Sequence, residues 1–255
     1  AMKGKDDKAL RVLAKIGGPE QAEATLAEIK STLHEKNAPW LSYGFFLIFI
    51  GIMLSVFQQF VGINAVLYYA ANIFRDMGAS TDSSLLQTII VGIVNGVFTV
   101  VAIVTVDKFG RKPLMIIGSI GMAISMMGLG FTFYSQHVGL LALIFMLTYT
   151  AAFAMSWGPV CWVLLSEIFP NSIRGALSIA VAAQWIANWA VSLTFPMMND
   201  NNSLNQHYHH GFAYWIYGVM GILSALFMWK LVPETKGKTL EQIEGLWKKR
   251  PANRA

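Results

Sequence analysis

The chain has 255 residues, of which 55% are hydrophobic and only 13% are charged, and its mean hydropathy is +0.51. This composition is too apolar for an ordinary soluble domain and indicates a membrane protein. The net charge of +5 does not indicate nucleic-acid binding, because the basic residues gather at the ends of apolar stretches and leave no basic face for a duplex.

The amino-terminal part of the chain, residues 1–40, is hydrophilic and charged. Asp6 to Ile16 and Glu20 to Leu33 have the pattern of short amphipathic helices, and a Gly-Gly-Pro sequence at 17–19 separates them. We therefore predict a cytoplasmic helical linker here, ahead of the first apolar stretch.

Six long stretches without Asp, Glu, Lys or Arg follow the linker, and a helix needs about 20 such residues to cross ~30 Å of hydrocarbon. They run roughly from Tyr43 to Phe74, Leu85 to Val106, Pro113 to Phe133, Leu140 to Ser166, Ala176 to Met198 and Phe212 to Trp229. The predicted fold is an all-α membrane protein, with a six-helix transmembrane bundle in residues 41–232 and a cytoplasmic tail in residues 233–255.

The first stretch is predicted to be a broken helix. Its outer half contains Gln58, Gln59, Gly62 and Asn64. Glycine and amide residues at membrane depth are typical of irregular backbone that lines a cavity. The alternative is a continuous helix whose amides bond to neighbouring helices.

The third stretch is rich in glycine and methionine, and its glycines include Gly118, Gly121 and Gly128. Small residues at a helix surface allow a neighbouring helix to approach closely. These residues would permit an interface with a partner helix, and they equally suit packing inside one bundle.

The positive charges predict the topology. With six spans, both ends of the chain lie on one side of the membrane, together with the loops at 107–112 and 167–175. Of the 19 lysines and arginines, Arg75 alone falls on the opposite side. Because cytoplasmic loops carry the excess of Lys and Arg, both termini are expected to be cytoplasmic.

Residues that bind metals are sparse. The single cysteine, Cys161, lies inside the fourth stretch, where we predict that it packs as a small apolar residue. His207, His209 and His210 cluster before the last stretch, but no carboxylate or cysteine accompanies them at a suitable spacing. A solvated loop is favoured over a metal site here, and we expect neither a metal nor a cofactor.

The polar side chains within the stretches are amides, tyrosines and tryptophans rather than ionisable groups. This set suits a neutral ligand rich in hydroxyl groups, because amides both donate and accept hydrogen bonds and indole rings stack on the C–H faces of sugars. The alternative is that the amides only join helices, at ~0.6–2 kcal/mol each; their spread over four stretches favours a binding site. The set is Gln58, Gln59, Asn64, Tyr68, Tyr69, Asn95, Trp157, Trp162, Gln184, Trp185, Asn188 and Trp189.

Four charged residues, Asp107, Arg111, Glu167 and Arg174, flank the stretches at their cytoplasmic ends. One interpretation is an ion-pair network that locks an inner gate and breaks when the gate opens. The other is a basic loop that sets the topology, with exposed carboxylates nearby.

Five motifs, in order, resemble the second half of the sugar porters of the major facilitator superfamily. They are the segments Gln58 to Asn64, Asp107 to Pro113, Trp157 to Trp162, Ser166 to Pro170 and Pro233 to Gly237. The resemblance implies that the sugar contacts are Gln58, Gln59, Asn64, Asn95, Trp162, Gln184 and Trp185, with Tyr68 closing the outer side. It also implies that Asp107, Arg111, Glu167 and Arg174 form a cytoplasmic charge network, and that residues 1–40 link two halves of a larger fold.

The resemblance covers one of the two six-helix halves of that fold, and alternating access needs both. The leading hypothesis is the carboxy-terminal half of a proton-coupled symporter of the bacterial inner membrane, which carries D-xylose or a hexose-type monosaccharide by alternating access. It would work with a separate amino-terminal half or as a homodimer. The alternative is a sugar-binding or structural half-bundle without transport activity. An enzyme is not expected, since the spans contain no nucleophile and base pair and no phosphate-binding loop.

Overall fold

The computed structural model describes residues 6–18, 21–27, 42–238, and then 242, 243, 245 and 247. These residues form helices, and no strand occurs among them. Six helical segments are long and apolar enough to cross a membrane: Phe45–Tyr68, Thr81–Phe109, Arg111–Tyr134, Leu140–Ile168, Leu177–Asn199 and Phe212–Lys230. The predicted all-α fold with six spans is confirmed.

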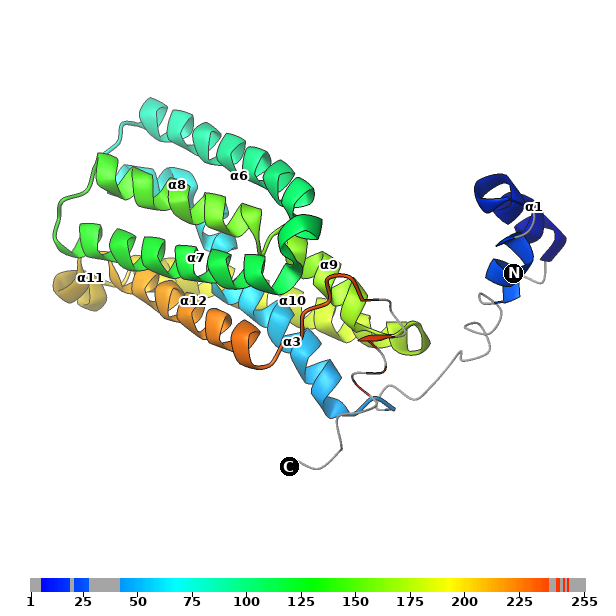
Figure 1. Ribbon diagram of the computed structural model, residues 1–255. Coiled ribbons are helices and arrows are strands. Elements are labelled where there is room, and N and C mark those ends of the chain that lie inside the picture. Colours follow the sequence, from blue (N-terminus) through cyan, green and yellow to red (C-terminus); the bar gives the residue numbers. More distant parts are fainter. Residues whose placement is uncertain are drawn as a thin grey trace.

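The spans pack side by side as one bundle (Figure 1). The elements are α1 (Asp6–Gly17), α3 (Phe45–Phe60), α4 (Ile63–Tyr68), α5 (Ala70–Asp76), α6 (Thr81–Phe109), α7 (Arg111–Tyr134), α8 (Leu140–Met155), α9 (Pro159–Ile168), the 3-10 helix η1 (Asn171–Ala176), α10 (Leu177–Asn199), α11 (Asn202–Tyr208) and α12 (Phe212–Lys230). Helix α8 lies between α6 and α7, α7 packs on α12, and α3 packs on α10. The first and fourth spans each consist of two helices, α3 with α4 and α8 with α9.

The ends of the chain are only partly described. Helix α1 and the helical residues 21–27 stand apart from the bundle (Figure 1), and the rest of the predicted linker lies outside the described residues. In the tail, Trp247 is buried and its ring N–H donates to the Ile168 carbonyl at 3.2 Å. This part of the tail therefore packs on the end of the bundle where α9 finishes.

Glycines bring α7 close to its neighbours. A Cβ placed on Gly118 would lie 1.8 Å from Ser156 Oγ, and one on Gly221 of α12 would lie 3.1 Å from Ala123 of α7. The lack of a side chain at these glycines leaves room for the contacts, so the close helix approach that the sequence allows occurs here inside the bundle.

The segment before the last span is not all loop, contrary to the expectation for this region. Residues 202–208 form α11, because the Asn201 side chain caps the helix by accepting the Leu204 N–H at 3.0 Å. None of the residues of α11 is buried, so the helix lies at the surface.

Candidate sugar-binding site

A chain of hydrogen-bonded amides joins α3, α4 and α10. The Gln184 amide donates to Gln58 Oε1, and Gln59 Nε2 donates to the same oxygen at 3.4 Å. The Asn64 amide donates to Gln59 Oε1 at 2.5 Å and to Asn188 Oδ1 at 2.8 Å. The first, broken span and α10 are thus held together by amide groups at the depth where the break occurs.

One buried atom of this amide network has no hydrogen-bond partner among the described residues. Gln184 Oε1 is buried and accepts no hydrogen bond in the part of the chain that the structure describes. A buried acceptor without a donor costs about 1–3 kcal/mol. A ligand hydroxyl that donates to this oxygen would recover that energy, so the network is suited to a polar, neutral ligand.

The break in the first span is confirmed, and a continuous helix is excluded. Helix α3 ends at Phe60, Gly62 adopts a left-handed conformation with φ of 93°, and α4 begins at Ile63. Such a φ suits glycine because it has no Cβ. The Tyr149 hydroxyl donates to the Val61 carbonyl at 2.8 Å, which supplies a partner that lipid does not offer.

The fourth span has a matching break, which the amide network also stabilises. Helix α8 ends at Met155 and α9 begins at Pro159. Gln58 Nε2 donates to the carbonyl of Trp157, inside this break, at 3.2 Å. Each broken span therefore provides a side chain that satisfies a backbone carbonyl at the break of the other.

The tryptophans of the predicted site differ in exposure: one is buried and structural, and the others are exposed. Trp157 is completely buried, and its ring N–H donates to Met115 O at 3.1 Å and to Ser119 Oγ at 2.7 Å. Trp162 is 45% exposed and Trp185 is 64% exposed. The open indole faces are available for stacking, whereas the ring of Trp157 holds α7 against the break.

Two predicted contacts stand outside the amide network. Tyr68, at the end of α4, is 61% exposed and so projects from the bundle. Asn95 is partly buried on α6, and its side chain joins none of the hydrogen bonds among the amides of α3, α4 and α10. The structure brings together Gln58, Gln59, Asn64 and Gln184, and the roles of all eight candidates as sugar contacts stay predictions.

A cluster of charged side chains lies away from the amide network, at the end of the bundle where α6 and α9 finish and α7 begins. Arg111 forms an ion pair with Glu167 at 2.7 Å, where the side chains are 13% and 22% exposed. It forms a second with Asp107 at 3.0 Å, but the Asp107 side chain is 79% exposed. Three of the four predicted gate residues therefore meet; the side chain of Arg174 lies outside the described residues.

Sequence reasoning did not place two residues of this cluster, Glu234 and Thr235. Glu234 accepts the backbone N–H groups of Arg111 at 3.2 Å and of Lys112 at 3.0 Å, and Thr235 Oγ1 donates to Glu167 Oε2 at 2.6 Å. The motif Pro233 to Gly237 was the available signal, but its sequence reveals only that the last helix ends there.

The chain resembles known sugar transporters along nearly its whole length. Residues 1–247 match the family model described as "Sugar (and other) transporter". The D-xylose-proton symporter of Escherichia coli strain K12 is 63% identical over 249 residues, and the glucose facilitated diffusion protein of Zymomonas mobilis is 44% identical over 252 residues. These alignments cover 96% and 97% of this chain.

A solved structure shows the same likeness in three dimensions. The major facilitator superfamily proton:xylose symporter XylE, bound to 6-bromo-6-deoxy-D-glucose, matches with a TM-score of 0.83 and 62% identity over 96% of this chain. The chain spans about half the length of these relatives: 51% and 53% of the two sequences and 53% of the solved chain. The matched family consists of transporters and not of enzymes. The chain belongs to the sugar transporter family of the major facilitator superfamily.

Proposed function

We propose that this chain forms one half of an alternating-access transporter that carries a monosaccharide across the bacterial inner membrane. The observation that supports this most directly is the amide network of α3, α4 and α10, with the unpartnered Gln184 Oε1 and the open faces of Trp162 and Trp185. Hydroxyl groups of a sugar match the amides, and its C–H faces match the indoles.

The proposed substrate is D-xylose or a related hexose. The relatives named above are described as a D-xylose symporter and a glucose facilitator, and the two sugars differ by one hydroxymethyl group. Proton coupling, as in a symporter, would depend on an ionisable residue in the other half, because the central parts of these six spans contain no Asp, Glu, Lys or Arg.

A second six-helix half is the proposed partner, either a separate amino-terminal half or a second copy of this chain. In the apolar part of the second span, α6, only 11% of the residues are buried inside the bundle, against 67% in the first span. A helix this apolar and this open is suited to a further layer of helices or lipid.

We further propose that both termini are cytoplasmic, as the distribution of Lys and Arg predicts. In that orientation, the Asp107, Arg111 and Glu167 cluster closes the cytoplasmic end of the bundle. Opening that end would separate Arg111 from Glu167, and the two ion pairs would then favour the outward-facing state.

Uptake into liposomes tests the proposal. The purified chain would be reconstituted alone and together with a separately expressed amino-terminal half of a related symporter, and uptake of radiolabelled D-xylose and D-glucose followed with and without a pH gradient. Saturable uptake is expected in at least one of these preparations. Gln58→Leu and Trp162→Ala should lower it at least tenfold.

Matched controls separate the site from general damage. Gln87→Leu changes an amide on α6 whose Nε2 donates only within that helix, to Ser83 Oγ at 3.4 Å. Phe131→Ala changes an exposed aromatic residue of α7. Both should keep uptake within twofold, and uptake that falls equally in all four variants would contradict the assignment of the site.

The alternative is a sugar-binding half-bundle without transport activity. Sugar binding without uptake in any preparation would establish that alternative. Binding to the isolated chain is expected to be weak, because half of the contacts of a complete site would be missing.

A further inference from the structure

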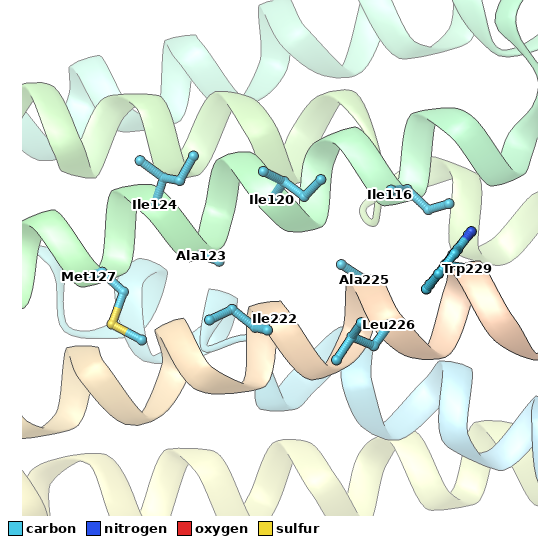
Figure 2. Close-up of a pocket in the computed structure, with 9 residues that line it drawn as sticks. All are labelled: Ile116, Ile120, Ala123, Ile124, Met127, Ile222, Ala225, Leu226 and Trp229. Atoms are coloured by element: carbon cyan, nitrogen blue, oxygen red, sulfur yellow. The ribbon is translucent and has the colours of Figure 1, made fainter.

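A groove of about 540 Å³ runs between α7 and α12, and it is separate from the amide network (Figure 2). All the residues that line it are apolar or aromatic. None of them lies on α3, α4 or α10, the helices that carry the amides.

The groove has a floor of small residues and walls of large ones. Ala123 of α7 and Ala225 of α12 lie where the helices approach each other, and Ile120, Ile124 and Leu226 stand along the sides (Figure 2). The three wall residues are exposed, whereas Ala123 is buried. The hollow therefore opens outward from the bundle, on a surface of hydrocarbon character.

The length of the groove matches one leaflet of a bilayer. It extends along α7 from Ile116 to Met127, which corresponds to ~16 Å at about 1.5 Å per residue. This is about half of the ~30 Å hydrocarbon core. The groove thus has the length of about one leaflet, and its Trp229 end lies near the end of α12.

Basic residues stand at the end of the groove that lies at the membrane surface. Trp229 lines this end. Lys112 Nζ donates to the Trp229 carbonyl at 2.8 Å, and Lys230 Nζ lies 6.0 Å from the centre of the Trp229 ring. No carboxylate lines the groove, and the carboxylate of Glu234 near this end accepts the backbone N–H of Lys112 at 3.0 Å. A ligand with an apolar chain would suit the groove, and a negatively charged head group would suit the amino groups of Lys112 and Lys230.

We propose that this groove binds an acyl chain of an anionic phospholipid from the leaflet on the basic side, with the phosphate held by Lys112 and Lys230. The dimensions of the groove favour a single chain over a helix as the group enclosed in it. A volume of about 540 Å³ spread over ~16 Å gives a mean cross-section of roughly 33 Å², whereas a helix about 10 Å across occupies about 80 Å².

Lipid titration of the purified full chain in detergent, followed by native mass spectrometry, tests the site. The probes are palmitoyl-oleoyl phosphatidylglycerol and the phosphatidylcholine with the same chains. Phosphatidylglycerol should bind about tenfold more tightly. The double variant Lys112→Gln/Lys230→Gln should abolish that preference without weakening phosphatidylcholine binding, and Ala225→Phe, which fills the floor, should weaken both lipids about tenfold.

Two controls match these changes. Arg75→Gln removes a positive charge at the opposite end of the bundle, and Val219→Phe adds a ring to an exposed position of α12 outside the groove. Both should bind the two lipids as the unchanged chain does. Equal affinity of the unchanged chain for the two lipids would overturn the proposal, and so would undiminished lipid binding to Ala225→Phe. If the unchanged chain forms dimers and Ala225→Phe is a monomer, the groove binds a second copy and the proposal is also overturned. No sugar is present, so the outcome is independent of the proposed transport.

Discussion

Replacing Glu234 by alanine tests how the start of α7 is stabilised. The N-cap residue of α7, Gly110, has no side chain that could accept the first backbone N–H groups of the helix. Glu234 does so from a distant part of the chain, accepting from Arg111 at 3.2 Å and from Lys112 at 3.0 Å. Its carboxylate acts as the missing cap of the helix.

The magnitude follows from two contributions that the alanine variant removes. A side-chain cap contributes about 1 kcal/mol, and a negative charge at a helix N-terminus contributes about 0.3–1 kcal/mol. Glu234→Ala should therefore lower the free energy of unfolding by about 2 kcal/mol. Glu234→Gln keeps one acceptor oxygen and loses the charge, so its cost should be about 1 kcal/mol.

Thermal unfolding of the full chain in detergent, followed by tryptophan fluorescence, measures the effect. For a chain of this size, about 2 kcal/mol corresponds to a decrease in Tm of about 4–8 °C. The control is Asp107→Asn, because the Asp107 side chain is 79% exposed and such a pair contributes about 0–1 kcal/mol. A decrease for Glu234→Ala no larger than that for Asp107→Asn would refute the capping role.

Three further substitutions have expected outcomes in the same assay. Gly62→Ala should lower the free energy of unfolding by at least about 2 kcal/mol, because its Cβ would lie 2.6 Å from the Tyr217 ring at a φ of 93°; an unchanged Tm would mean that the backbone there relaxes easily. Trp157→Phe removes the fused pyrrole ring together with the N–H that donates to Ser119 Oγ at 2.7 Å, and because the side chain is completely buried it should cost at least about 2 kcal/mol, whereas the same change at an exposed tryptophan should cost less than half as much. Glu167→Gln removes the charge that faces a partly buried guanidinium and should cost about 1–3 kcal/mol; a loss below 0.5 kcal/mol would show that the pair behaves as a surface ion pair.

The spans and the break in the first of them could be predicted because both have a local signature. The thickness of the hydrocarbon core fixes the length of an apolar stretch. The combination of Gly62 with neighbouring amides signals irregular backbone wherever lipid cannot supply hydrogen bonds. Gln58 and Gln184 could be predicted as candidates because amides inside apolar spans suit a neutral polar ligand, and the structure joins these two by a hydrogen bond.

The long-range contacts could not be predicted from the residues alone. Glu234 caps a helix that begins 123 residues earlier in the chain, and its own neighbours are those of an ordinary helix end. The completely buried Trp157 and the exposed Trp185 are the same residue type, each within an apolar span. Only the packing of the helices separates a structural tryptophan from an open one.

If Asn64 contacts the sugar, as proposed above, its position would link sugar binding to the position of α4. Because the helix is already interrupted at Gly62, α4 can turn without breaking a hydrogen bond of α3. The bonds from Asn64 to Gln59 and to Asn188 help to hold α4 in place. A sugar that took the Asn64 amide would compete with those bonds, so sugar affinity and the freedom of α4 would be reciprocally coupled, and a substitution that loosens α4 would change affinity without touching the sugar.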